Sequence, residues 1–252
     1  QSDMLIVNGI IERIGEGLST SDATSFDFTG KTIAPGFCDM HVHFREPGYE
    51  HKEDIASGAA AAAVGGFTAA ACMPNTDPPI DSASVATFVL KRAEGLAVDV
   101  YPIGAVTKGR KGESLAPMIE LREAGCVAFS DDGSPVYNTK VLRTALEYAS
   151  MLDVPIIQHA EDPHLFKGGA MNESIVSTQI GLPPISRLSE DTVVVRDIAF
   201  AEYVNGRYHL AHMSTAGAAE AVRDAKRRGL RVTSEVAPHH FSLTDESLRG
   251  YD

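Results

Sequence analysis

The sequence lacks long hydrophobic runs and contains few cysteines. No stretch of 18 or more consecutive apolar residues occurs in the 252 residues, which argues against a membrane span. The first residues, QSDMLIVNG, show neither a basic n-region nor a cleavage-site pattern, so we see no secretory signal. Cys38, Cys72 and Cys126 are odd in number and lie in apolar, strand-like runs. We expect them to be reduced core thiols of a cytoplasmic protein.

Basic residues are also scarce. The chain has 22 Lys and Arg residues against 34 Asp and Glu residues, which gives a formal net charge of −12. This balance argues against a nucleic-acid partner, because binding to a phosphate backbone requires basic surface. The acidic residues are spread along the chain rather than gathered in a tail, and this spread is typical of a solvated surface.

Short apolar runs alternate with segments of helical period. Seven strand–helix alternations can be counted, which predicts a parallel sheet with helical crossovers. The expected strands lie within residues 31–44, 67–76, 97–106, 126–133, 154–162, 207–215 and 230–240. A doubly wound open sheet and a (β/α)8 TIM-type barrel both fit this alternation. No glycine-rich phosphate fingerprint follows the first strand, which disfavours the dinucleotide-binding form of the open sheet.

Polar residues with useful chemistry follow strand after strand, and this pattern favours the barrel. Barrel enzymes build their sites from the carboxyl ends of several strands, whereas an open sheet concentrates them at one switch point. The residues concerned are His41, His43, Asn75, Asp132, His159, His212 and His239. We therefore predict an α/β barrel.

The predicted domains divide near residue 34. Residues 1–34 read as short strands with turns and are expected to form a small β subdomain, the N-terminal part of a β-sandwich. Residues 35–252 are expected to form the barrel. A closed barrel needs eight strands and about seven are visible, so we expect this barrel to be truncated.

His41 and His43 stand one residue apart at the end of an apolar strand. Residues i and i+2 of a strand point to the same side, so the two imidazoles can hold one metal ion together. His159 and His212 each follow an apolar run, and for either one alone a core histidine is an equal alternative. Metal becomes the favoured reading because the four histidines share one expected barrel face.

The remaining polar candidates are weaker. Asp131 and Asp132 end another strand, where a carboxylate could bind one metal or bridge two, although Asp-Gly is also ordinary turn chemistry. We interpret His209 as structural. The other histidines carry no pairing signal as strong: His51, His164, His239 and His240.

Nine sequence elements together resemble one family. They are HVHFREPG, KEDI, GGFT, MPNT, FSDDGSPV, HAED, STQIGLPPIS, AHMSTA and EVAPHH. The chain resembles the amidohydrolase superfamily over nearly its whole length, and specifically type I dihydroorotase. The resemblance implies a metal-dependent cyclic amide hydrolase: zinc-dependent, reversible hydrolysis of L-dihydroorotate to N-carbamoyl-L-aspartate in de novo pyrimidine biosynthesis. It also implies a cytoplasmic hydrolase with a small-molecule substrate and one or two Zn²⁺ ions per subunit.

The resemblance assigns roles residue by residue. His41 and His43 would bind the more buried metal, His159 and His212 the second, and Asp132 would bridge them. No lysine lies in residues 126–133, so a carboxylated lysine is excluded at that position. The substrate-binding residues would be His43, Arg45 and Asn75. The family's proton carrier is an aspartate that ends an eighth strand, which would lie beyond Asp252.

Two other readings remain open. A related cyclic amidase, allantoinase or hydantoinase, is the alternative enzyme, although FREPG with MPNT favours a substrate that bears a carboxylate. A non-catalytic dihydroorotase-like partner of aspartate transcarbamoylase is the second alternative. Such chains commonly lose metal ligands, whereas this one keeps each ligand that precedes the eighth strand. A homo-oligomer is also expected.

Overall fold

The computed structural model describes residues 2–18 and 22–251, which form two compact units. The first unit ends at Gly36, and the second begins at Phe37. The outer limits of the two predicted ranges, residues 1 and 252, lie outside the described residues, as does the segment 19–21.

The first unit contains a β-hairpin. Strands β1 (Asp3–Val7) and β2 (Ile10–Gly15) pair antiparallel. Their turn is Asn8-Gly9, with φ of 52° and 77°. Asn-Gly is the preferred sequence where both central residues need positive φ, because that twist matches the strands. This turn joins the two strands of the hairpin.

The second unit is built on a parallel sheet of seven strands. The strands are β3 (Phe37–Val42), β4 (Phe67–Cys72), β5 (Asp99–Gly104), β6 (Ala128–Ser130), β7 (Pro155–Gln158), β10 (Arg207–Leu210) and β11 (Val232–Ser234). Their order is β11-β10-β7-β6-β5-β4-β3, and every neighbouring pair is parallel. The predicted seven-strand parallel sheet is confirmed. Within the described residues, β3 and β11 are its two edges.

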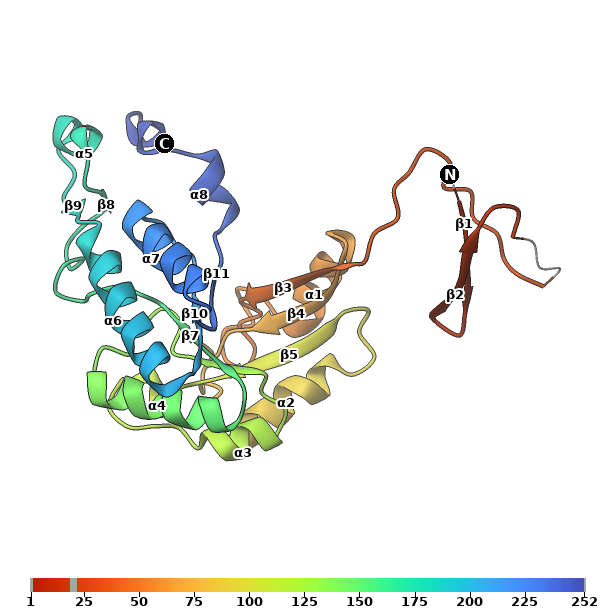
Figure 1. Ribbon diagram of the computed structural model, residues 1–252, viewed down its shortest axis with the longest axis horizontal. Helices are drawn as coiled ribbons and strands as arrows, with labels where there is room; N and C mark the ends of the chain where they lie inside the picture. Colours follow the sequence, from red (N-terminus) through yellow and green to blue (C-terminus); the bar gives the residue numbers. More distant parts are fainter. Residues whose placement is uncertain (1, 19–21, 252) are drawn as a thin grey trace. The chain divides into compact units, whose positions relative to one another are not determined.

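Helices cross over between successive strands and cover one face of the curved sheet (Figure 1). They are α1 (Ile55–Val64), α2 (Ala83–Ala93), α3 (Met118–Glu123), α4 (Thr139–Met151), α6 (Leu188–Val204) and α7 (Ala216–Arg227). Ile156 packs in the buried cluster that contains α4 residues, whereas the next residue, Ile157, joins a separate cluster with Met73 and Ala211. This alternation is the two-residue period of a strand with both faces buried.

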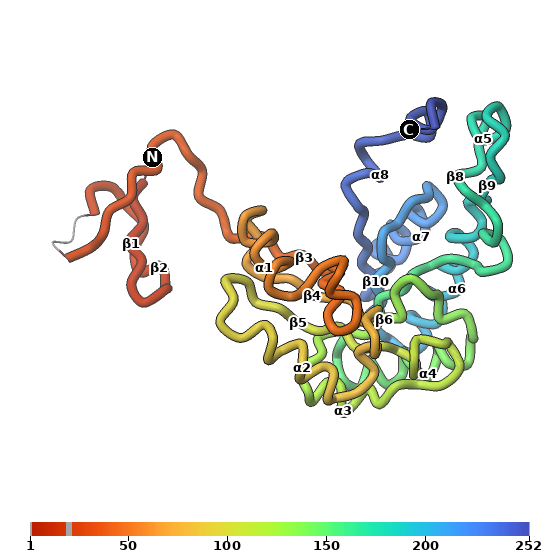
Figure 2. The backbone as a smooth tube through the Cα atoms, turned by 180° about the vertical axis from the view of Figure 1, so that it is seen from behind, coloured from red at the N-terminus to blue at the C-terminus, as the bar shows by residue number. Residues whose placement is uncertain are grey.

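One excursion was not predicted. Between β7 and α6 the chain forms β8 (Met171–Asn172), α5 (Ile175–Ile180) and β9 (Pro184–Ile185), and β8 pairs with β9 in parallel. After β11 come α8 (Pro238–Ser242) and the 3₁₀ turn η2 (Asp245–Leu248). Figure 2 shows both segments projecting on the same side of the sheet. The Tyr251 hydroxyl donates to the carbonyl oxygen of Ile180, which links them.

The thiol prediction is partly wrong. Cys72 and Cys126 are buried, whereas Cys38 is exposed. Cys38 belongs to β3, an edge strand of the described sheet, so its side chain lacks the cover that inner strands receive. No helix in the described ranges is long and apolar enough to cross a membrane.

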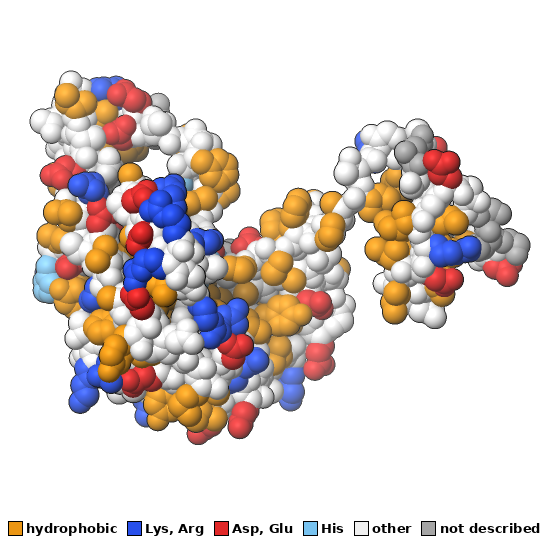
Figure 3. Space-filling view, viewed as in Figure 1, with side chains coloured by type: hydrophobic (Ala, Val, Ile, Leu, Met, Phe, Trp, Pro, Cys, Tyr) orange, Lys and Arg blue, Asp and Glu red, His pale blue; other side chains and the backbone are white. Residues whose placement is uncertain are grey.

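Acidic and basic side chains are mixed over the helical surface (Figure 3). On α7, Glu220 pairs with Arg223 and Arg227, and Arg228 pairs with Glu202 of α6. Exposed pairs of this kind contribute little to stability and keep the surface hydrated.

A buried polar network fixes the loops that follow β6 and β7. Asp197 of α6 is fully buried and accepts from Gln158 Nε2 at 2.8 Å, Arg196 Nε at 2.7 Å and the Tyr208 hydroxyl at 3.3 Å. Gln158 Oε1 in turn accepts from the backbone N–H of Val136 at 3.1 Å. The network therefore ties α6 to the residue before His159 and to the loop after Asp132.

Burial raises the pKa of Asp197 to about 6, although Arg196 and the donors from Gln158 and Tyr208 favour the charged form. A carboxyl group whose pKa is higher in the folded than in the unfolded state stabilises the fold most when it is protonated. Its contribution is present below about pH 4 and is lost as the pH rises to about 6, by up to about 3 kcal/mol.

We predict that Asp197→Asn removes this dependence. The free energy of unfolding, measured by urea denaturation between pH 4 and 7, should fall more steeply with pH in the wild type than in the variant. The difference between the two free energies of unfolding at each pH removes the contribution of the other titrating groups. Parallel curves would contradict the prediction.

Candidate metal centre

The five predicted ligands all come from the carboxyl ends of strands. His41 belongs to β3 and His43 follows it directly, Asp132 follows β6, His159 follows β7, and His212 follows β10. Parallel strands present these ends at the same rim of the sheet. The structure brings all five side chains together there.

His41, His43 and Asp132 form the first group. One ligand atom from each residue lies within 4.8 Å of the others. His41 Nε2 is 3.3 Å from Asp132 Oδ1, and His43 Nε2 is 3.6 Å from Oδ2. Both histidines therefore face the same carboxylate, as the one-residue spacing predicts.

Asp132, His159 and His212 form the second group, again with ligand atoms within 4.8 Å of one another. His159 Nδ1 lies 2.9 Å from His212 Nε2, which is 3.9 Å from Asp132 Oδ1. Asp132 is common to both groups. A single carboxylate facing two pairs of imidazoles is an arrangement that can bridge two cations.

The protonation states differ across the centre. Burial raises the pKa of Asp132, but the hydrogen bond from His41 and the neighbouring histidines outweigh it and hold the pKa at about 2. Burial, reinforced by His159, lowers the pKa of His212 to about 4. Asp132 is therefore ionised and His212 neutral near pH 7, which is the state in which each can bind a metal. Burial also opposes the charge on His41, yet Asp132 and Glu235 raise its pKa to about 9.

Asp131 has a different role from its neighbour. It is buried and accepts from the backbone N–H groups of Val106 at 2.9 Å and Thr107 at 3.0 Å, and from the Thr107 hydroxyl. Asp131 thus ties the end of β6 to the loop after β5. Arg110 donates to the backbone oxygen of Asp132 from the other side. These contacts leave the Asp132 side chain directed at the histidines.

Asn75 and Arg45 adjoin the first group. Asn75 Oδ1 lies 3.0 Å from His43 Nδ1, and Asn75 Nδ2 donates to Asp132 Oδ2 at 2.9 Å. When His43 Nδ1 donates to Asn75, Nε2 keeps its lone pair for a metal. Arg45 is half-buried and has a left-handed φ of 62°. Burial lowers the pKa of His43, and the nearby charge of Arg45 adds to this effect. Within the described residues, the Arg45 guanidinium has no hydrogen-bond or ion-pair partner.

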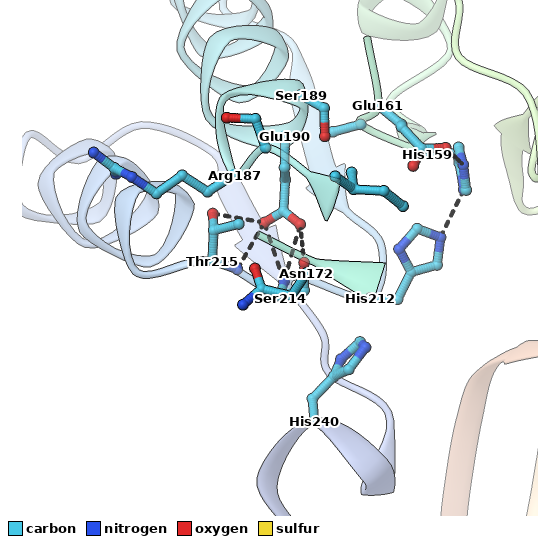
Figure 4. A pocket seen from close by; sticks show the side chains of 13 residues that line it. His159, Glu161, Asn172, Arg187, Ser189, Glu190, His212, Ser214, Thr215 and His240 are labelled. Carbon is cyan, nitrogen blue, oxygen red and sulfur yellow. Dashed lines mark hydrogen bonds and ion pairs between the residues drawn. The ribbon is translucent and has the colours of Figure 1, made fainter. Parts of the chain in front are cut away.

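A carboxylate clamp holds the loop that carries His212. Glu190 Oε1 accepts from the backbone N–H groups of Ser214 at 3.0 Å and Thr215 at 3.1 Å, and both hydroxyls donate to the same carboxylate (Figure 4). Thr215 also caps α7 through Ala218 N. His212 has a φ of 36°, which is a strained conformation for a residue with a side chain.

A pocket of about 260 Å³ opens beside the second group (Figure 4). Figure 4 shows His159 and His212 on one side of the pocket and His240 below. The other lining residues are Ala160, Glu161, Asn172, Ile185, Ser186, Arg187, Ser189, Glu190, Ser214 and Thr215. His239 and His240 lie in α8, and His239 does not join either group of ligands.

Sequence reasoning missed two acidic residues that contact ligands. Glu235 Oε1 lies 2.5 Å from His41 Nδ1, and Glu161 Oε2 lies 3.2 Å from His159 Nε2. Each follows a strand within a short motif, EVAPHH or HAED, so position at a strand end was an available signal. His209, interpreted as structural, is buried, with Nδ1 2.8 Å from the Thr233 hydroxyl.

A family model described as dihydro-orotase-like matches residues 30–218. The chain belongs to this family. It is 51% identical over 252 residues to a dihydroorotase from Citrifermentans bemidjiense and 53% identical over 254 residues to one from Pelotomaculum thermopropionicum. These alignments cover 99% and 100% of this chain, but 59% of each relative. The chain thus spans about three fifths of their length.

Solved structures agree on the fold. An L-hydantoinase from Arthrobacter aurescens superimposes with a TM-score of 0.77 at 22% identity, over 97% of this chain and 56% of the other. A dihydropyrimidinase from Brevibacillus agri gives 0.77 at 23% identity, over 98% and 56%. The predicted α/β barrel fold is confirmed, with seven parallel strands in the residues described here.

We predict that Asp132→Ala reduces metal binding by both groups, because it removes their shared ligand. The affinity should fall by more than about tenfold, since even the outer partners of metal ligands are worth about 10- to 100-fold. Metal content per chain, measured by elemental analysis after dialysis, checks this. Asp224→Ala, on the exposed side of α7, is the matched control and should keep wild-type content. Full occupancy in Asp132→Ala would contradict the shared-ligand geometry.

Proposed function

We propose that the full-length protein is a zinc-dependent dihydroorotase that interconverts L-dihydroorotate and N-carbamoyl-L-aspartate in de novo pyrimidine biosynthesis in the cytoplasm. Support comes from the family match and from two dihydroorotases about half identical to this chain. The observation that carries the proposal is the half-buried guanidinium of Arg45, which has no partner among the described residues and lies beside a centre built around one shared carboxylate.

The donor set suits zinc. Four imidazoles and one carboxylate are typical Zn²⁺ ligands, and fewer than four protein ligands to one ion leave a position open. We assign His41, His43 and Asp132 to one ion and Asp132, His159 and His212 to a second. Zinc bound at such a centre lowers the pKa of water toward neutrality and polarises a carbonyl group.

The chain's own residues hold the metal ligands in place and would orient the substrate. Asp132 remains ionised because its pKa is held at about 2. Asn75 fixes His43 and Asp132 relative to one another through its amide. Arg45 would bind the substrate carboxylate, because a guanidinium offers two parallel donors to the two oxygens. The family resemblance gives proton transfer to an aspartate of an eighth strand, so we assign that role to none of residues 37–251.

A related cyclic amidase is the second candidate. Hydantoinase and dihydropyrimidinase structures share the fold, but their identity of 22–23% is far below that of the dihydroorotases. Arg45 also favours a substrate with a carboxylate, which hydantoin and allantoin lack. A non-catalytic role beside aspartate transcarbamoylase is disfavoured because all five ligand positions are retained and converge.

Ring opening measured on full-length protein tests the proposal. Dihydroorotate, allantoin and hydantoin are supplied separately, and we expect hydrolysis of dihydroorotate. Activity on the other two alone would favour the related amidase. A zinc-loaded protein inactive on all three would favour the non-catalytic role.

Arg45→Ala should weaken substrate binding while metal content stays at the wild-type value. A hydrogen bond to a charged group is worth about 1.5–3 kcal/mol, so we expect the KM for dihydroorotate to rise about ten- to a hundredfold. Arg143→Ala, on the exposed side of α4, is the matched control and should leave KM unchanged. Loss of metal from Arg45→Ala equal to that from Asp132→Ala would contradict the two roles.

A further inference from the structure

Glu235 touches a ligand of the first group from the far edge of the sheet. It follows β11, one edge of the described sheet, whereas His41 lies in β3, the other edge. Glu235 Oε1 nevertheless lies 2.5 Å from His41 Nδ1. The side chains are 22% and 13% exposed, so the contact is shielded from bulk water.

The contact with Glu235 determines which nitrogen of His41 can bind a metal. A carboxylate only accepts hydrogen bonds, so His41 Nδ1 must carry the proton that it donates to Glu235. Nε2, which faces Asp132 Oδ1 at 3.3 Å, is then the nitrogen that gives up its proton and offers its lone pair when a metal binds. A carboxylate behind a ligating histidine fixes the ring orientation and the tautomer and raises the basicity of the ligand.

Glu235 is itself held in place. Its backbone N–H donates to Leu210 O at 3.1 Å, and its carbonyl oxygen accepts from Met213 N at 2.9 Å. Its second oxygen lies 3.4 Å from Nε2 of the buried His209, whose other nitrogen contacts Thr233. Backbone and side chain are therefore both fixed, which a positioning residue requires.

The contact also joins the two sheet edges. Backbone hydrogen bonds connect the strands only from neighbour to neighbour along the order β11 to β3. The His41–Glu235 contact instead joins β3 to the end of β11 directly, across residues 194 positions apart in the chain. His41 is thus oriented correctly only when the two edges hold their native separation.

Glu161 provides an internal comparison. It contacts His159 Nε2 at 3.2 Å, which leaves Nδ1 facing the second group. His159 and Glu161 are two positions apart just after β7, so this contact is local. The two acidic residues therefore support different groups, one across the sheet and one within a single strand end.

We propose that Glu235 is the positioning residue for His41: it sets the tautomer and orientation of that ligand and makes metal affinity of the first group depend on the β3–β11 separation. The inference rests on the proposed metal centre, but it concerns metal binding and not the substrate.

The experiment compares Co²⁺ binding to metal-depleted full-length protein in the wild type, Glu235→Ala, Glu235→Gln, Glu161→Gln and the control Glu202→Gln. Glu202 is an exposed α6 residue paired with Arg228. His43→Ala and His212→Ala provide reference spectra that assign the visible absorption bands to the first and second groups. Circular dichroism and the unfolding midpoint are recorded for each variant.

We expect Glu235→Ala to weaken Co²⁺ binding to the first group by about 10- to 100-fold and to alter its absorption bands, with the second group unchanged. Glu235→Gln should fall between Ala and the wild type, because its amide oxygen can still accept from Nδ1. Glu161→Gln should weaken the second group only, and Glu202→Gln should match the wild type.

Wild-type Co²⁺ affinity and bands for the first group in Glu235→Ala would overturn the inference. Equal weakening of both groups with a lowered unfolding midpoint would also overturn it, since Glu235 would then be purely structural. The expected pattern in a protein that does not hydrolyse dihydroorotate would uphold the inference and reject the proposed function.

Discussion

The whole centre depends on the buried carboxylate of Asp132. Its two oxygens face imidazoles from three other strands, and the side chain is only 6% exposed. An unpaired carboxylate at that depth would be strongly destabilising, so the surrounding histidines and the Asn75 amide are needed for its burial. The same contacts keep it ionised and directed inward. The strands that converge here are therefore held together by the chemistry of the site as well as by their backbone hydrogen bonds.

Other buried acidic groups hold the loops around this carboxylate. Asp131 ties β6 to the loop after β5, and Asp197 ties α6 to the loops after β6 and β7. Glu190 accepts from the backbone N–H groups of Ser214 and Thr215 and thereby fixes the segment between His212 and α7. Each accepts several hydrogen bonds, which is how charge is tolerated in a core. These three carboxylates therefore have a structural role in the loops around the centre.

The sequence was sufficient where the signal is local. The two-residue period of a strand was enough to predict that His41 and His43 point to the same side. Seven apolar runs predicted the seven parallel strands. Contacts between residues far apart in the chain could not be predicted from the sequence. Glu235 meets His41 across 194 positions, and no local period predicts that proximity. The β8–β9 excursion contains two-residue strands, too short to show a two-residue alternation. Cys38 was misjudged because an apolar run does not reveal whether its strand is inner or edge.

The left-handed backbone of His212 has a consequence for how the centre is assembled. A conformation of this kind costs about 1–3 kcal/mol and persists only when its surroundings impose it. Here Glu190 imposes the conformation by accepting from the backbone N–H groups of Ser214 and Thr215, two and three residues after His212. None of these contacts involves a metal. The free-energy cost of this conformation is therefore offset during folding and not when a metal binds. His212 is therefore oriented before a cation binds, and the contacts between α6 and the start of α7 preorganise this ligand.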